Sequence, residues 1–175
     1  MSIHRGIRPS TTQSTTALQL KSVLNAVLFF ALFMVALPCL AAWLLPAPLA
    51  LPRWIAWPVG ATLAVGGLAV WFLCLDAFSR RGAGTPFPLD APRHLVTSGP
   101  FGVVRNPIMA AEIAVIWGEA FLFGILGLWV YAVLISAMAQ VLIVRIEEPE
   151  LRDRFGAEYD EYCQRVPRWV PRGRS

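Results

Sequence analysis

Two glutamates stand inside a long apolar stretch of the chain. Glu112 and Glu119 lie in the run from Pro107 to Val144, seven residues apart, so a helix would place both on one face. Charged side chains inside a membrane helix are costly and usually serve a function. One interpretation is a polar lining for a cavity within a helical bundle. The other is a pair of carboxylates neutralised by partner helices or lying near the far interface.

A second polar group surrounds the same apolar run. Arg105 precedes it, and Arg145, Glu147 and Glu148 follow its end. Carboxylates bind ammonium groups, and a guanidinium can hold a carboxylate through two hydrogen bonds. A ligand that carries both an ammonium and a carboxylate would therefore find both complements here. Adjacent glutamates are also common at the solvated start of a tail, and that alternative stays open.

The residues directly before the run are typical of a helix start. Asn106 suits the N-cap position, and Pro107 suits the first helical position. The free N–H groups of a first turn can hold an anionic or polar ligand group. An ordinary helix start has the same residue types. These two residues therefore do not distinguish a ligand-binding site from a simple helix start.

The elements that position these residues are membrane helices. Val23 to Leu45 and Trp54 to Leu75 carry no charged residue, and the third run holds 38 residues. One spanning helix needs about 20 apolar residues, so the third run suits two helices joined at the glycines near Gly124. We predict an all-α integral membrane bundle of about four helices. Their approximate ranges are 20–45, 54–77, 107–123 and 127–146, and the third is short.

The basic residues predict the orientation of this bundle. Of 15 Lys and Arg residues, 14 lie before the first helix, between the second and third, or after the fourth, whereas Arg53 alone lies in the loop between the first two. The positive-inside rule makes the side with 14 cytosolic. We therefore predict a multi-pass protein with both termini in the cytosol.

Composition argues against two other classes of site. The net charge is +4, but no soluble basic domain is present, so no nucleic-acid partner is predicted. Cys39, Cys74 and Cys163 give neither a disulfide framework nor metal-ligand spacing, so no metal site is predicted.

Outside the predicted membrane helices, the chain contains three further segments. Residues 1–17 are polar and are predicted to form a disordered cytosolic tail, which leaves 18–175 as a single membrane domain. Residues 78–106 form a loop rich in Gly and Pro. A loop of this length with little secondary structure is unusual unless it binds a ligand or partner. Residues 147–163 predict one short amphipathic helix. Its apolar face would hold Leu151, Phe155, Tyr159 and Tyr162.

Several motifs in this loop and tail resemble known membrane methyltransferases. Residues 94–101 read HLVTSGPF and are followed by Arg105-Asn106-Pro107. This resembles the cytosolic motif of the isoprenylcysteine carboxyl methyltransferase family, x-L-V-T-x-G-x-Y and then R-H/N-P-x-Y. The run from Glu147 to Pro171 is similar to the C-terminal signature of that family. The glutamate pair and Gly82-Ala83-Gly84 also resemble the Glu-Glu and G-x-G motifs of the related phosphatidylethanolamine N-methyltransferases. Together the motifs cover about residues 80–171.

The resemblance implies a small helical bundle that binds S-adenosylmethionine (SAM) at its cytosolic face and methylates a lipophilic acceptor. Carried over residue by residue, it implies cofactor contacts at Arg93, His94, Leu95, Val96, Phe101, Asn106, Pro107, Ile108, Met109, Glu147 and Glu148. Candidate catalytic residues are Arg105, Glu112 and Arg145. Met109 stands where the family commonly has Tyr.

The chemistry of methyl transfer leaves two acceptors open. A carboxylate, as in an isoprenylcysteine, is already a nucleophile and would favour a nearby arginine such as Arg145. An amine, as in a phospholipid head group, must first lose a proton, and Glu112 could assist. The acceptor is expected to enter laterally from the bilayer among membrane lipids, and no protein partner is predicted.

Two other functions remain as alternatives at the level of sequence. The same superfamily includes membrane reductases that use NADPH. A non-catalytic membrane protein is the third possibility, and it predicts that the loop tolerates substitution of Arg105 and Asn106.

Overall fold

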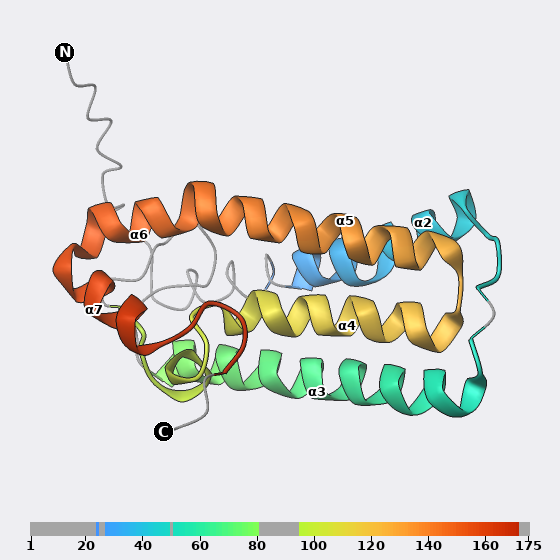
Figure 1. Ribbon diagram of the computed structural model, residues 1–175, viewed down its shortest axis with the longest axis horizontal. Helices are drawn as coiled ribbons and strands as arrows, with labels where there is room; N and C mark the ends of the chain where they lie inside the picture. The colour runs from blue at the N-terminus through green and yellow to red at the C-terminus, as the bar shows by residue number, and fades with distance from the viewer. Residues whose placement is uncertain (1–23, 25–26, 50, 81–94, 172–175) are drawn as a thin grey trace, which may run out of the picture.

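The computed structural model describes residues 24, 27–49, 51–80 and 95–171, and this part of the chain is helical, without a β-strand. The long helices run side by side (Figure 1). The elements are η1 (Leu32–Ala36), α2 (Leu37–Leu44), α3 (Arg53–Arg80), η2 (Gly99–Gly102), α4 (Pro107–Phe123), α5 (Leu126–Leu142), η3 (Ile143–Glu147), α6 (Glu148–Phe155) and α7 (Ala157–Arg165). The all-α membrane bundle predicted from the sequence is confirmed.

Three helices of the described residues are long and apolar enough to cross a membrane: Val27–Leu44, Arg53–Ala77 and Leu126–Phe155. The fourth, α4, has the predicted bounds but only 17 residues. At 1.5 Å per residue it extends about 25 Å, short of the roughly 30 Å hydrocarbon layer. The count of four complete spans therefore stays a prediction. So do the tail over 1–17, which lies outside the described residues, and the single domain over 18–175.

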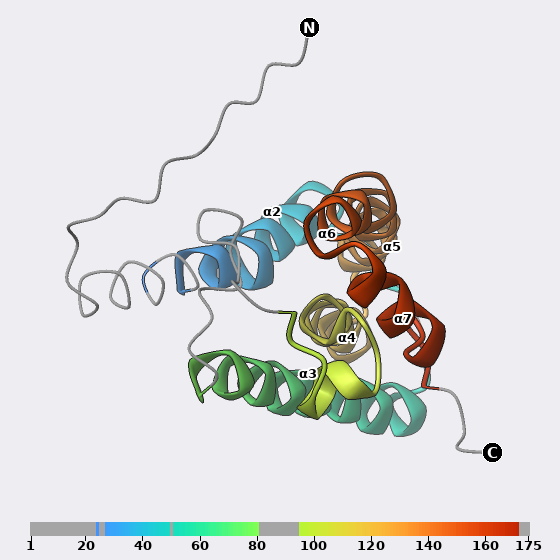
Figure 2. The ribbon, with the colours of Figure 1, turned by 90° about the vertical axis from the view of Figure 1, so that its left-hand side faces the viewer.

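Helix α4 lies at the centre of the bundle. Seen from the end, it is enclosed by α3 on one side, by α5 and α6 on another, and by α7 (Figure 2). Its buried residues include Ala111, Ile116, Gly118 and Ala120, which point to more than one side of the helix. This explains why α4 carries no clear polar stripe, and it makes α4 the element against which the others are positioned.

Small residues bring α3 and α4 into close contact. A Cβ atom at Gly118 would lie 2.7 Å from the backbone nitrogen of Ala64 and 2.9 Å from the carbonyl oxygen of Gly60. A Cβ atom at Gly67 would lie 2.7 Å from the carbonyl oxygen of Ala111. Membrane helices have little hydrophobic drive to associate, so such small residues let their backbones pack through van der Waals contact.

The turn between α4 and α5 closes the far end of the bundle. Gly124 adopts φ 61°, the left-handed conformation that glycine reaches without strain, and ends α4. The turn is tied to the loop after α2, because the Leu49 amide donates to the Gly124 carbonyl at 2.6 Å and the Leu126 amide to the Ala47 carbonyl at 2.8 Å. The reversal predicted at these glycines is confirmed.

A proline shapes the first helix. Pro38 has no N–H, and in the preceding π-helix η1 each N–H bonds five residues back, as Leu37 does to the carbonyl of Leu32. The carbonyl of Phe33 therefore lacks a backbone donor. The Tyr131 hydroxyl of α5 donates to that oxygen at 2.8 Å, which joins the first helix to the bundle.

The prediction of one amphipathic helix over 147–163 is wrong. Gly156, at φ 54° and ψ −126°, splits this region into α6 and α7. Few residues other than glycine adopt that conformation, so the backbone turns here. The four apolar residues assigned to one face nevertheless meet in a single cluster, which contains Tyr159 and Tyr162 together with Leu151 and Phe155.

We expect the variant Gly118→Ala to destabilise the bundle, because its new methyl group would meet backbone atoms of α3 that cannot move freely. Overpacking of this kind costs about 1–3 kcal/mol. Gly66→Ala is the matched control, since a Cβ atom there has no other atom within 4 Å. Thermal unfolding in detergent should separate the two variants. Equal stability of both would contradict the proposed close packing.

Candidate functional site

The π-helix η3 decides which glutamate faces the interior. Ala139 and Ile143 are buried on one face, four residues apart, and a regular α-helix would bring Glu147 next onto that face. The wider turn of η3 contains one residue more, so Glu148 is buried instead, with 7% of its surface exposed, and Glu147 is exposed. Single π-turns of this kind are frequent at functional sites.

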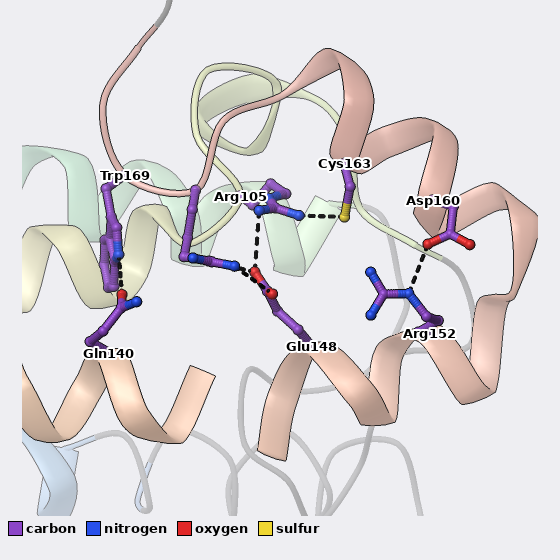
Figure 3. A network of polar contacts seen from close by, with 8 residues as sticks. Arg105, Gln140, Glu148, Arg152, Asp160, Cys163 and Trp169 are labelled. Carbon is purple, nitrogen blue, oxygen red and sulfur yellow. Dashed lines mark hydrogen bonds and ion pairs between the residues drawn. The ribbon is translucent and has the colours of Figure 1, made fainter. Parts of the chain in front are cut away.

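Two arginines hold the buried carboxylate of Glu148. Arg168 donates Nε and Nη2 to the two carboxylate oxygens, each at 2.7 Å. Nη2 of Arg105 lies 3.2 Å from Oε1 of the same carboxylate, and Nη1 of Arg105 donates to the Cys163 thiol (Figure 3). We call Arg105, Glu148 and Arg168 the arginine clamp. It joins the start of α4, the start of α6 and the C-terminal segment.

Further hydrogen bonds attach the C-terminal segment around the clamp. The amide of Arg105 donates to the Pro167 carbonyl at 2.8 Å. The Tyr162 hydroxyl donates to the Phe101 carbonyl at 2.6 Å, and burial raises the pKa of this phenol, so it keeps its proton as a donor. Trp169 donates to Gln140 at 2.7 Å (Figure 3). These contacts bring α7 and the following residues over the start of α4.

The start of α4 contains two buried donors without an acceptor. Asn106 occupies the N-cap position, but its side chain makes no capping hydrogen bond. Nδ2 of Asn106 and Nε of Arg105 are both buried and have no hydrogen-bond partner. A buried donor without a partner costs free energy, so this arrangement is suited to a ligand that accepts from both.

An apolar cavity of about 140 Å³ lies beside the first turns of α4. Met109, Glu112, Ile113 and Ile116 of α4 form one wall. The others are Ile135, Met138, Ala139 and Leu142 of α5 and Phe29, Phe33 and Met34 of the first helix. Glu112 is the one charged residue among them, and Trp71 of α3 donates its indole N–H to Oε1 at 3.2 Å. Met138 and Leu142 are exposed, so the cavity reaches the lipid-facing surface.

A family model described as phospholipid methyltransferase matches residues 55–158. This is 104 of the 175 residues, and it includes most of α3, the start of α4, the cavity residues of α4 and α5, and Glu148. The chain belongs to the phospholipid methyltransferase family. It is thus a membrane protein of a methyltransferase family. No curated protein matches the chain.

Within this member of the family, the residues predicted to bind the cofactor fall into separate environments. Val96, Phe101 and Ile108 pack with Cys74 and Ala77 at the end of α3. Leu95 packs against the tyrosine cluster of α6 and α7, and Pro107 is fully buried. These five side chains are therefore packed within the protein around the start of α4. Asn106 and Glu148 lie at the clamp, and Met109 lines the cavity.

The other residues predicted for the site also lie in different parts of the structure. Arg105 belongs to the clamp and Glu112 to the cavity. Arg145 and Glu147 are exposed, and neither forms an ion pair with another described residue. Arg93 and His94, like Gly82 and Gly84, lie outside the described residues.

Sequence reasoning missed Arg168, Tyr162 and Trp71 as parts of the site. In the sequence, Arg168 contributes only to the distribution of basic residues that predicts the orientation, and Tyr162 contributes only to the apolar face of a predicted helix. The available signal was that a carboxylate inside the bundle requires a cation and donors, and Arg168 directly follows the motif residue Pro167. No pattern in the sequence relates Trp71 to Glu112, 41 residues away.

We expect Glu148→Gln to lower the free energy of unfolding by about 3 kcal/mol, because two partly buried arginines would lose their counter-charge at a buried position. The exposed ion pair of Arg152 with Asp160, at 2.8 Å, supplies the control. Arg152→Ala should leave stability almost unchanged, since exposed pairs contribute little. Chemical unfolding in detergent would measure both. A loss no larger for Glu148→Gln than for Arg152→Ala would show that the clamp does not hold the C-terminal segment.

Proposed function

We propose that the protein transfers a methyl group from SAM to a membrane-embedded acceptor at the cytosolic end of the bundle. One observation carries this proposal. Two unpartnered polar donors, at Arg105 and Asn106, directly precede α4, and a carboxylate in its second turn, Glu112, lies in the wall of an apolar cavity. A polar methyl donor and a lipophilic acceptor could therefore meet across a few residues of one helix.

The residues around the clamp fit the polar part of SAM. Bound SAM supplies an electrophilic methyl group on a sulfonium. Its amino-acid end carries an ammonium and a carboxylate, which need opposite partners. Glu148 is already occupied by two arginines, so its role is to position Arg105. Glu147 is exposed beside it and is the carboxylate that we assign to the ammonium.

The cavity fits an acceptor that arrives from the bilayer. Its lining is apolar apart from Glu112, and its opening lies at Met138 and Leu142 on the lipid side of α5. Lateral entry would keep the hydrocarbon part of the acceptor out of water. Excluding water around the reacting atoms also strengthens electrostatic interactions there.

The charge of the cavity favours an amine acceptor over a carboxylate. A carboxylate would be repelled by Glu112, and no cationic side chain is among the described lining residues. Arg145, the residue that a carboxylate acceptor would need, is exposed rather than part of the lining. Glu112 can attract an ammonium and take its proton, which leaves the amine lone pair free to attack. The hydrogen bond from Trp71 orients the Glu112 carboxylate for this task.

The charge distribution supports the side of the membrane on which we place the reaction. The 14 basic residues on one side include Arg105, Arg145 and Arg168, so the clamp belongs to the cytosolic end. Both termini are then cytosolic, and SAM reaches the site directly from the cytosol.

We expect detergent-purified protein to bind SAM and S-adenosylhomocysteine but not NADPH in calorimetric titrations. We expect this because the chain belongs to a methyltransferase family, and because groups around the clamp suit both the ammonium and the carboxylate of these two ligands. Binding of NADPH without SAM would favour a reductase instead. Binding of none of the three would favour a non-catalytic membrane protein.

We also expect Glu112→Gln to reduce methyl transfer to an amine-bearing lipid by about 100-fold or more, the usual contribution of a general base. Affinity for S-adenosylhomocysteine should stay within about twofold. Glu119→Gln is the matched control, because Glu119 lies seven residues further along the same helix and does not line the cavity. Radiolabelled methyl transfer into lipid vesicles would measure both variants. Equal activities would remove Glu112 from the mechanism.

A further inference from the structure

Exposed tryptophans mark one boundary of the bilayer, at the end of the bundle opposite the arginine clamp. Trp43 of α2 and Trp54 of α3 have 75% and 78% of their surface exposed. The Gly127 amide donates to the Leu45 carbonyl at 3.0 Å, so α5 begins at this same end. Tryptophan is enriched where a membrane meets water, because its ring is apolar and its N–H is polar. The hydrocarbon layer therefore begins near the start of α5.

The length of α5 places Gln140 within this layer. From Leu126 to Gln140 the helix rises about 21 Å, whereas the hydrocarbon layer is about 30 Å thick. The other boundary then falls near Arg145, which is exposed and is the first charged residue of this helix. Gln140 is exposed, and Val133, seven residues earlier on the same face, has 54% of its surface exposed. This face therefore meets lipid, and an amide at this depth needs a polar partner from the protein.

The C-terminal segment supplies that partner. Nε1 of Trp169 donates to Oε1 of Gln140 at 2.7 Å (Figure 3). The preceding residue, Arg168, holds Glu148, which lies eight residues beyond Gln140 in the same long helix. Eight helical residues rise about 12 Å, so the side chain of Trp169 reaches a point nearer the membrane centre than that of Arg168. Val170, the next residue, has 74% of its surface exposed.

We propose that residues 166–171 form an interfacial anchor, in which Trp169 and Val170 insert into the cytosolic leaflet of a phospholipid bilayer. Insertion takes the exposed valine out of water, and the bond to Gln140 satisfies the indole N–H where lipid offers no acceptor. The segment also contains two prolines, which lack the N–H groups that an irregular backbone at the interface would leave unpaired.

The anchor links the bilayer to the arginine clamp. Arg168 directly precedes Trp169, and its guanidinium donates to both carboxylate oxygens of Glu148. Lipid that keeps residues 169 and 170 in place therefore also keeps the clamp closed. This consequence does not depend on which methyl donor or acceptor the site binds.

Quenching of tryptophan fluorescence tests the insertion directly. Trp169→Phe keeps an apolar ring but removes one emitter, so the emission of wild type minus that of the variant belongs to Trp169. The full chain would be placed in nanodiscs, which leave both membrane faces open to solvent. We expect phospholipid brominated near the top of its acyl chains to quench this difference more strongly than aqueous acrylamide does. Stronger quenching by acrylamide would place the side chain in water and overturn the anchor.

The rate at which Cys163 reacts with a polar maleimide tests the link to the clamp, because this thiol accepts a hydrogen bond from Arg105. The background is Cys39→Ser, since the third cysteine is buried. Val170→Asp puts a carboxylate, which must stay in water, into the anchor. We expect this variant to raise the labelling rate in nanodiscs roughly tenfold, because labelling follows the population of the opened segment.

Two matched variants make the labelling result decisive. Val170→Leu keeps an apolar side chain and should label at the wild-type rate. Ala157→Asp adds the same charge at an exposed position of α7, outside the anchor, and should also leave the rate unchanged. A wild-type rate for Val170→Asp would show that the bilayer does not hold the clamp. An equal rise for Ala157→Asp would make the effect one of charge alone, and either result would overturn the proposal. Absence of SAM binding would overturn the proposed function and leave these expected rates unchanged.

Discussion

The pairing of Glu148 with two arginines is the interaction on which the polar end of this molecule depends. A carboxylate that is 93% buried is unfavourable unless charges and hydrogen bonds compensate it, and here three segments of the chain meet to do so. Arg105 comes from the start of α4 and Arg168 from beyond α7. The clamp therefore determines where the C-terminal segment lies, and with it the surroundings of the candidate donor site.

Helix α4 connects this polar end to the apolar cavity. One side of α4 is occupied by α3, where glycines at 60, 67 and 118 allow backbone contact. That close contact fixes the rotation of α4 about its axis. Met109 and Glu112 are then held toward α5 and the first helix, where the cavity forms. Packing on one side of α4 thus orients the chemistry on another.

Hydropathy alone predicted the helices well, because lipid requires long apolar segments with satisfied backbones. The bounds of α4 match the prediction, and the glycines marked the turn before α5. The sequence did not reveal the extra residue of η3. Regular helical spacing places Glu147 inward, whereas the wider π-turn places Glu148 there. Such a shift depends on tertiary packing, not on local propensity. For the same reason the pairing of Arg168 with Glu148 could not be predicted.

The shift at η3 also explains how two adjacent glutamates can serve different roles. A single turn of helix exposes Glu147 and buries Glu148 between arginines. If both glutamates faced outward, the guanidinium of Arg105 would lack its counter-charge. Its side chain would then be free to turn away from the start of α4. If both faced inward, their mutual repulsion would need further cations within a bundle that offers few. One carboxylate that positions Arg105 and one that remains open to a cationic group is the arrangement that a zwitterionic amino-acid end requires.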